Sequence, residues 1–377
     1  MRVEKIANRQ FMYITVIMLA TVVFSTLPVL TTGNARQDAW ASGLLAFAGV
    51  ALFVNVIVGL GVHFPRCSVV QVSRKLLGNA AGGLVSLIIL WSFLHLASLE
   101  VRIYAEMIIG GFLTETPLVF VVGAMIMVAV AAAYAGIEVI GRLADLFFPL
   151  LIAMFLVSFF SLLFEAKFIN LQPVLARGLG PVLESSYNTI AYSSYLMVLG
   201  ILIPHLTRPR KATASAFWGA AVAAFILVIT AVLTVAVLGP EEGFRSVFPF
   251  FRSLRAIRVT EFLERTELLV IFAWGFSLFV ALSTFIYCGG RGVAQLFNLK
   301  DYRPILLPMG VIWAALSVHS SPDMFEFRGL YLSYVFGAYG LFLVLFPYVF
   351  LWGGYLFRKM TGQNPEEERG EEKSAER

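Results

Sequence analysis

The chain has 377 residues, of which 59% are hydrophobic and 14% are charged, and its formal net charge is +5. A soluble globular protein is typically about half apolar and about a quarter charged, so this composition excludes an ordinary water-soluble domain. Most apolar residues lie in continuous runs of membrane-spanning length. Because these runs do not alternate with polar residues, membrane β-strands are excluded as well. The basic residues cluster in short connections, which is typical of membrane topology and indicates no nucleic-acid partner.

Ten apolar segments are expected to cross the lipid bilayer as helices. Their residue ranges are 11–31, 39–62, 82–109, 117–134, 139–164, 187–204, 214–238, 263–288, 305–318 and 331–356. The first segment contains Pro28 and lacks a convincing cleavage site, so no cleavable signal peptide is expected. The ninth segment is the shortest and contains Pro308.

Both termini are expected in the cytoplasm, because an even number of spans puts them on one side and the positive-inside rule selects that side. With the N-terminus inside, the inner segments carry fifteen Lys and Arg residues before the tail is counted, against nine in the outer segments. The tail, residues 361–377, contains six Glu residues and is expected to be disordered. Residues 1–360 are expected to form a single transmembrane domain.

The two halves of the chain, residues 10–164 and 187–358, share one plan. Spans four and nine are the short ones, and spans one and six each contain a polar or proline interruption. The longer connections, residues 64–81 and 239–262, mix apolar and basic residues as short interfacial helices do. Matching irregularities in corresponding positions predict a five-plus-five inverted repeat with broken spans one and six.

Pro28 interrupts the first span, since proline has no backbone N–H and clashes with the preceding helical turn. The carbonyls around Phe24 and Ser25 then lose their helical partners, which a membrane tolerates where the freed backbone is buried in protein or lines a wet cavity. One interpretation is a broken helix that binds the carboxylate and ammonium groups of a ligand. The alternative is a simple kink that the Ser25 and Thr26 hydroxyls repair.

The sixth span begins with a run of small and hydroxylated residues that includes Tyr192, Ser193, Ser194 and Tyr195. Serine hydroxyls can satisfy freed backbone groups and tyrosine can wall a pocket, so one interpretation is a second irregular span at the ligand site. The alternative is a helix-packing face, because small residues let helices approach closely.

The third span places five side chains on one helical face, at intervals of three or four positions. They are Trp91, His95, Ser98, Arg102 and Glu106. Arg102 and Glu106 are spaced for an ion pair. His95 is either a proton-responsive group or a hydrogen-bonded packing histidine. Glu100 lies on the opposite face and needs a partner of its own or a position near the interface.

The eighth span has Trp274 and Ser277 on one face, which suits either a pocket wall or helix packing. In the fifth span, Arg142 and Asp145 are spaced to pair with each other. The candidate ligand-binding residues of spans one, three, six and eight are Ser25, Thr26, Leu27, His95, Ser98, Tyr192, Ser193, Ser194, Trp274 and Ser277.

Motifs that would indicate an enzyme are missing from the sequence. It contains no nucleotide-binding loop, no metal-ligating cluster of His and Cys, and no persuasive pair of nucleophile and base. The two cysteines, Cys67 and Cys288, are expected to be unpaired small hydrophobic residues. Neither catalysis, nor a cofactor, nor a metal is therefore expected.

Several short segments carry a family resemblance that covers nearly the whole chain. They are Gln37-Asp38-Ala39-Trp40, Thr114-Glu115-Thr116-Pro117, the segment 136–145, Gln172-Pro173-Val174-Leu175, and Phe262-Leu263-Glu264-Arg265 with the downstream Trp274. In their order and spacing, the chain resembles the B-subunit permeases of bacterial spore germinant receptors. These belong to the amino acid–polyamine–organocation transporter superfamily.

The resemblance implies an all-α, leucine-transporter-like membrane fold with a ligand pocket near the membrane centre, lined by spans one, three, six and eight. It also implies a receptor in the inner spore membrane, built with an A-type membrane subunit and a C-type lipoprotein, that senses a small nutrient such as an amino acid. The segment Ser25-Thr26-Leu27-Pro28 departs from the glycine pair of many transporters in the superfamily.

Three functions are compatible with the sequence. The first is a nutrient sensor in which ligand binding shifts a conformational equilibrium and signals germination. The alternative is a working amino-acid transporter, with or without coupling to protons. A purely structural assembly subunit would need no pocket.

Overall fold

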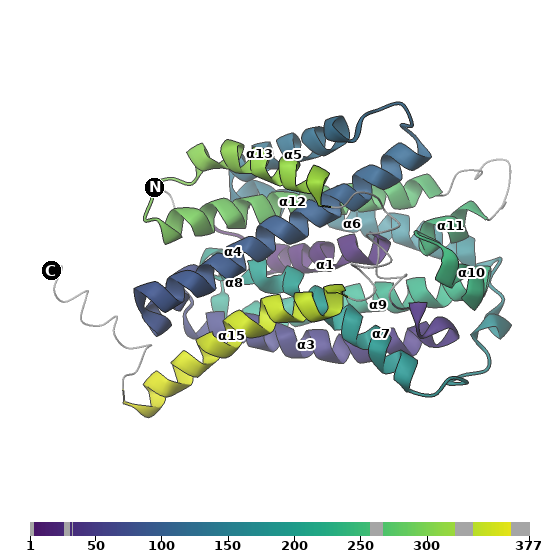
Figure 1. The fold of residues 1–377 in the computed structure, drawn as a ribbon, viewed down its shortest axis with the longest axis horizontal. Helices are drawn as coiled ribbons and strands as arrows, with labels where there is room; N and C mark the ends of the chain where they lie inside the picture. Colours follow the sequence, from purple (N-terminus) through teal and green to yellow (C-terminus); the bar gives the residue numbers. More distant parts are fainter. Residues whose placement is uncertain (1–3, 26–30, 32, 257–266, 321–334, 363–377) are drawn as a thin grey trace.

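The computed structural model describes residues 4–25, 31, 33–256, 267–320 and 335–362, and its regular elements within these ranges are helices (Figure 1). In chain order they are α1 Asn8–Ser25, η1 Arg36–Asp38, α3 Ala39–His63, α4 Val69–Gly111, α5 Leu118–Ala135, α6 Ile137–Leu163, η2 Phe168–Leu171, α7 Gly180–Ile190, η3 Ala191–Val198, α8 Leu199–Leu202, η4 Ile203–His205, η5 Pro209–Lys211, α9 Ala212–Leu238, α10 Pro240–Arg245, α11 Pro249–Arg255, α12 Glu267–Leu296, α13 Arg303–His319 and α15 Phe336–Met360. The η elements are 3₁₀-helices.

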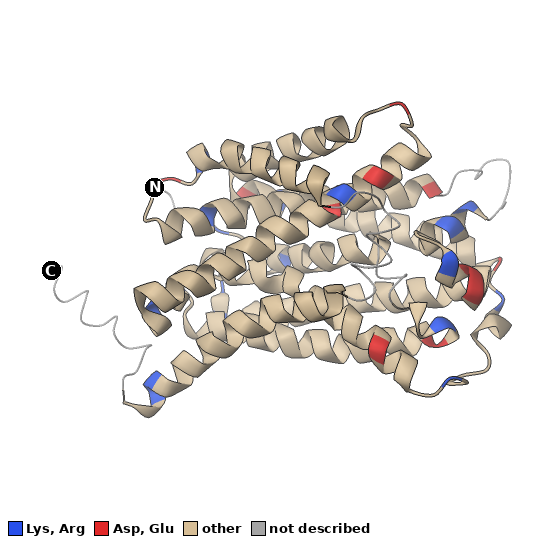
Figure 2. Ribbon diagram, viewed as in Figure 1, with Lys and Arg blue, Asp and Glu red and all other residues tan. Residues whose placement is uncertain are grey.

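Each predicted membrane span coincides with helical structure in the described residues. Nine segments there are long and apolar enough to cross a membrane, and α13 is a shorter apolar helix of 17 residues. The predicted starts of spans eight and ten, residues 263 and 331, lie outside the described residues. The chain is an integral membrane protein, and Figure 2 shows its charged residues mostly toward the two ends of the helix bundle.

The centre of the bundle is formed by α1, α12 and the segment from α7 to η4. In the apolar window of that segment 89% of the residues are buried, against 28% in α6. The helix α1 packs on α9 and α12, and α12 packs in turn on α4 and α6. Peripheral helices such as α5 instead expose large apolar side chains, among them Phe120 and Met127, as lipid-facing helices do. The central segments are therefore the ones that can enclose a site.

The predicted short helices in the two longer connections are present. Ser68 caps α4 with a capping box, and Gly78 then interrupts α4 with a φ of 81°. Residues 69–77 are thereby a separate helical piece before the third span. A Cβ on Gly82 would lie 2.4 Å from the Ser73 carbonyl oxygen, so only glycine allows the two pieces to approach this closely. The second connection contains α10 and α11.

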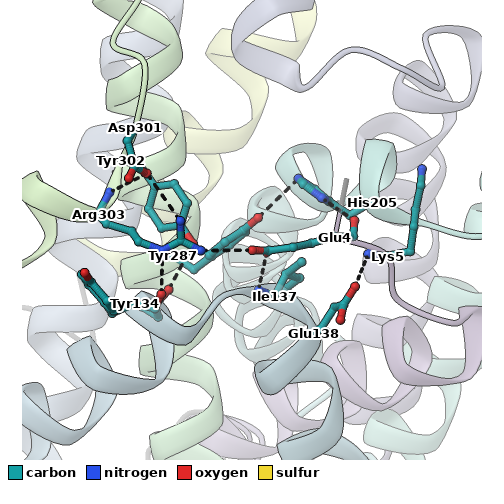
Figure 3. A network of polar contacts seen from close by, with 11 residues as sticks. Glu4, Lys5, Tyr134, Ile137, Glu138, His205, Tyr287, Asp301, Tyr302 and Arg303 are labelled. Carbon is teal, nitrogen blue, oxygen red and sulfur yellow. Dashed lines mark hydrogen bonds and ion pairs between the residues drawn. The ribbon is translucent and has the colours of Figure 1, made fainter. Parts of the chain in front are cut away.

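The N-terminal residues lie across one end of the bundle, where the carboxylate and the backbone carbonyl of Glu4 together contact three segments (Figure 3). It accepts hydrogen bonds from the Ile137 amide at 3.0 Å and from Arg303 Nη2 at 3.4 Å. The Glu4 carbonyl accepts one from His205 Nδ1 at 3.1 Å. Glu4 therefore ties the N-terminus to the start of α6, the end of span six and the start of α13.

One predicted pair is wrong. Asp145 does not pair with Arg142, because Arg9 Nε and Gln10 Nε2 bind its carboxylate at 3.1 Å and 2.8 Å. The packing of α1 on α6 brings these donors to Asp145, whereas Arg142 is exposed. The short-range spacing of Arg142 and Asp145 gave no information about this long-range contact.

Replacing Glu4 tests the role of the N-terminal contacts. The Glu4→Ala substitution leaves the Ile137 amide and Arg303 without this acceptor, so we expect a fall of about 2–4 °C in the apparent unfolding temperature of the purified protein in detergent. Glu165→Ala, which changes an exposed carboxylate, is the matched control and should have no effect. Equal unfolding temperatures for the two variants would contradict this role.

Candidate functional site

The sixth span is irregular where its polar run lies. The helix α7 ends at Ile190, and the next eight residues, Ala191–Val198, form the 3₁₀-helix η3 before α8 continues the span. Stretches of 3₁₀-helix longer than about four residues are uncommon, and a 3₁₀ stretch inside a helix often marks a functional hinge. Tyr192, Ser193, Ser194 and Tyr195 all lie in η3. The predicted interruption of span six is confirmed.

The predicted break in span one cannot be compared in the same way. The described part of the helix ends at Ser25, and Thr26, Leu27 and Pro28 lie outside the described residues. Ser25 itself is buried, and its hydroxyl donates to the Val22 carbonyl at 3.3 Å. Ser25 thus marks the point where α1 reaches the centre of the bundle.

A buried carboxyl group joins α4 to both of these segments. Glu100 is only 2% exposed, although it lies within a membrane span. The Tyr195 hydroxyl donates to Glu100 Oε1 at 3.0 Å, and the Ser25 hydroxyl makes a longer contact with Oε2 at 3.5 Å. Burying a carboxyl group in an apolar region costs several kcal/mol unless donors compensate. Glu100, Tyr195 and Ser25 therefore form one polar centre among α4, η3 and α1.

Aromatic rings surround this polar centre. The Tyr195 ring lies 5.6 Å from Phe285 and 5.7 Å from Tyr192, measured between ring centroids. Tyr192 in turn lies 4.5 Å from Phe336 on α15. Such a wall is apolar apart from the tyrosine hydroxyls, so it excludes water and strengthens electrostatic contacts with Glu100. A few polar groups within an apolar wall are typical of small-molecule sites.

Three predicted site residues have buried polar atoms without a partner. They are Ser193 Oγ, Ser194 Oγ and Trp274 Nε1, none of which makes a hydrogen bond to any residue that the structure describes. Most buried side-chain polar atoms are hydrogen-bonded, so each exception calls for an explanation. The Trp274 ring packs edge-on against Tyr104 at 5.1 Å, one helical turn after Glu100 on α4. Their hydrogen-bonding capacity is unmet within the described structure.

His95 and Ser98 lie on other parts of α4. The His95 Nδ1 and the Tyr339 hydroxyl are 2.9 Å apart, and Trp91 stacks on the His95 ring at 5.5 Å. Ser98 donates to the carbonyls of Leu94 and Trp313. Five residues separate His95 from Glu100, which turns the side chains roughly 140° apart around the helix. His95 therefore contacts α15, and Ser98 contacts α13.

Each of the remaining predicted residues contacts a group one helical turn away on its own helix. Ser277 is buried and donates to the Ala273 carbonyl at 2.8 Å. The predicted ion pair between Arg102 and Glu106 is confirmed, with Nη2 and Oε1 2.6 Å apart, and Arg102 also donates to the Val318 carbonyl. Arg102 thereby connects this face of α4 to the end of α13.

Glu100 was missing from the predicted ligand-binding residues, although the sequence carried a signal for it. A carboxylate in the middle of the predicted third span is costly and is a functional candidate for that reason alone. Glu100 lies on the helical face opposite His95, so it was not grouped with the polar residues of the His95 face. What the sequence could not supply was the identity of its partners, Ser25 and Tyr195.

Comparison with known proteins gives a consistent family. The model of a family described as "Spore germination protein" matches residues 5–324. Spore germination protein KB of Bacillus subtilis (strain 168) is 26% identical over 307 residues, which cover 80% of this chain and 82% of the relative. Spore germination protein YndE of the same organism is 26% identical over 335 residues, covering 87% of this chain and 92% of that protein.

Solved transporter structures share the fold. Mhp1, a nucleobase-cation-symport-1 family transporter in a closed conformation with bromovinylhydantoin bound, matches with a TM-score of 0.73 at 11% identity over 95% of this chain and 80% of its own. MhsT in complex with L-phenylalanine matches with a TM-score of 0.66 at 15% identity over 91% and 90%. The predicted leucine-transporter-like fold is thereby confirmed, and at these identities the likeness concerns the fold alone.

The contact between Tyr195 and Glu100 can be tested by removing one hydroxyl. Tyr195→Phe takes a donor from a buried carboxyl group, so we expect a loss of stability equivalent to roughly 1–3 kcal/mol, measured as a lower apparent unfolding temperature in detergent. Tyr348→Phe is the matched control, because the buried Tyr348 hydroxyl has no hydrogen-bond partner among the described residues.

The same pair of substitutions should behave differently once Glu100 is gone. In a Glu100→Leu background, Tyr195→Phe should cost less, because the hydrogen bond that couples the two positions is already gone. Equal costs for Tyr195→Phe and Tyr348→Phe in the native background would contradict the assigned contact.

Proposed function

Because this chain belongs to the family of spore germination proteins that act as germinant receptor permeases, we propose that it is the membrane subunit of a spore germinant receptor that binds a small nutrient, an amino acid, and signals germination. The observation that carries the proposal is the buried Glu100 carboxyl group, held by Tyr195 and Ser25 at the centre of the bundle. A membrane protein with a purely structural role would have no need of this costly group.

The chemistry of the centre suits an amino acid. A carboxylate in an apolar, aromatic surrounding pairs favourably with an ammonium group, because the low dielectric strengthens the attraction. The Ser193 and Ser194 hydroxyls are buried and unpartnered in the described structure, so they can donate to the carboxylate of the same ligand. The neighbouring rings of Tyr192 and Phe336 supply an apolar surface for a side chain.

The same geometry suggests how binding becomes a signal. A ligand ammonium group that pairs with Glu100 competes with the Tyr195 hydroxyl for Oε1. Tyr195 belongs to η3, so the competition favours a different conformation of span six. A ligand shifts a conformational equilibrium only by the difference between its affinities for the two states. In this proposal that difference comes from the exchange of partners at Glu100.

The partners and the location of the protein belong to the proposal as well. We place it in the inner membrane of the spore, with both termini in the cytoplasm because of the excess of basic residues on that side. Its partners are an A-type membrane subunit and a C-type lipoprotein. These partners are carried over from the resemblance to germinant-receptor B subunits, which the match to the spore germination family supports.

A working amino-acid transporter is the second candidate. The fold is shared with MhsT, whose structure holds L-phenylalanine, and with the transporter Mhp1. Uptake of radiolabelled L-amino acids into liposomes that contain only this chain separates the two functions. The sensor is expected to bind without accumulation of label above protein-free liposomes. Sustained uptake that Glu100→Gln abolishes would favour the transporter.

Ligand binding at Glu100 has a direct test. We expect at least one of the standard L-amino acids to raise the apparent unfolding temperature of the purified protein, because a ligand that binds only the folded state stabilises it. Glu100→Gln removes the charge with little change in shape and should abolish this shift. Glu165→Gln, at an exposed site, is the control and should retain it.

The same two variants are then placed in spores in which this receptor is the only one. Glu100→Gln should lose the germination response while the protein is still found in the membrane, and Glu165→Gln should respond normally. A normal response of Glu100→Gln would contradict the proposed site.

A further inference from the structure

A cleft lined by cationic side chains opens at the end of the bundle where the N-terminal residues lie. Its volume is about 900 Å³, and it is formed by the N-terminus, the connection between α3 and α4, the end of span six and α12. The cationic side chains along it are Lys5, Arg66, Arg208, Arg210, Lys211 and Arg291. Among the described residues no Asp or Glu lines this cleft, which we call the basic cleft.

Some other cations at this end of the bundle have partners. Arg9 pairs with Asp145, and Arg303 pairs with Glu4. Arg74 donates to the Leu296 carbonyl at 2.5 Å. Within the described ranges, by contrast, Arg66 and Arg291 form no ion pair, and neither do the three cations of segment 208–211. The positive-inside rule explains why cations occur at this end, but it does not explain why six of them line one cavity that has no acidic side chain among its described lining residues.

Arg291 gives a second, independent indication of a ligand. Its guanidinium carbon lies 5.7 Å from the centroid of the Tyr302 ring. Its Nε is shielded from solvent and has no hydrogen-bond partner in the part of the chain that the structure describes. An N–H group that is neither hydrated nor bonded costs free energy, and a rotation of the guanidinium toward an acceptor in the cleft would recover it.

We propose that the basic cleft is a binding site for a multivalent phosphate-type oxyanion. Arginine presents a planar array of donors that matches phosphate oxygens, and Gln71, Thr207 and Gln295 supply neutral hydrogen-bonding groups in the same cleft. Cations gathered along one concave surface raise the local concentration of anions. The anion in turn relieves the repulsion among the cations, and the volume suits a small organic phosphate.

Two sources can supply this chemistry. One is a soluble phosphate-bearing metabolite, and the other is the phosphate headgroup of an anionic lipid, since the cleft lies at the ends of membrane spans. Neither source depends on the proposed nutrient site. Tyr195 lies in η3, whereas the first residue of span six that lines the cleft is Pro204, near the end of that span. The inference therefore goes beyond the proposed function and can fail independently of it.

The soluble source is tested with inorganic pyrophosphate as the probe. We expect pyrophosphate to bind the purified full-length protein in calorimetry, and potassium chloride of equal ionic strength to give no binding heat. Arg208→Gln combined with Arg210→Gln changes two exposed side chains, so the fold should persist. This double variant should weaken binding by about tenfold or more. Arg9→Gln, outside the cleft, is the matched control and should bind as the native protein does.

The lipid source is tested with vesicles on the native protein, on the same double variant and on Arg291→Gln. Phosphatidylglycerol should be retained by the native protein in native mass spectrometry in preference to phosphatidylcholine, and the double variant and Arg291→Gln should both lose this preference. Binding in either arm that depends on the cleft arginines supports the proposal and identifies the source. Failure of both probes to bind, or binding that the double variant and Arg291→Gln leave unchanged, would overturn it.

Discussion

A carboxyl group inside a membrane protein must find its hydrogen-bond donors within the protein, and this constraint organises the centre of the molecule. Glu100 is buried on α4, and its donors come from the end of the described α1 and from η3 in span six. Three segments that are distant in sequence are thereby held at one point. The surrounding rings keep water out, so the contacts are stronger than they would be at the surface. Any ligand that enters this centre must compete for Glu100 or for its donors.

The sequence was informative wherever the physics is local. Hydropathy predicted the spans because each one must be apolar along its whole length. The pair of Arg102 and Glu106 was predictable because the two residues are one helical turn apart. The polar run of span six predicted an irregularity, and the chain forms a 3₁₀-helix there. The partners of Glu100 were not predictable, because Ser25 and Tyr195 lie 75 and 95 positions away. The partner of Asp145 was not predictable for the same reason, because Arg9 lies 136 positions away.

Polar groups of two kinds occur at two different places in the helix bundle. At the centre, the Glu100 carboxyl group has donors, while the Ser193 and Ser194 hydroxyls in η3 have no hydrogen-bond partner among the described residues. At the end of the bundle, Glu4 and Asp145 satisfy some cations, and the cations of the basic cleft remain unpaired in the described structure. The first arrangement suits a zwitterion with an ammonium group and a carboxylate. The second suits an anion. The two proposals together give one chain two sites of different charge at different positions along the bundle.

The central claim is that an amino acid binds by exchanging partners at Glu100. An experimental structure of the protein with its activating amino acid tests this claim most directly. The account predicts that the ligand nitrogen lies within hydrogen-bonding distance of a Glu100 oxygen, and that the Tyr195 hydroxyl has moved away from Oε1. A structure in which the ligand occupies another place, while Tyr195 still donates to Glu100, would contradict it.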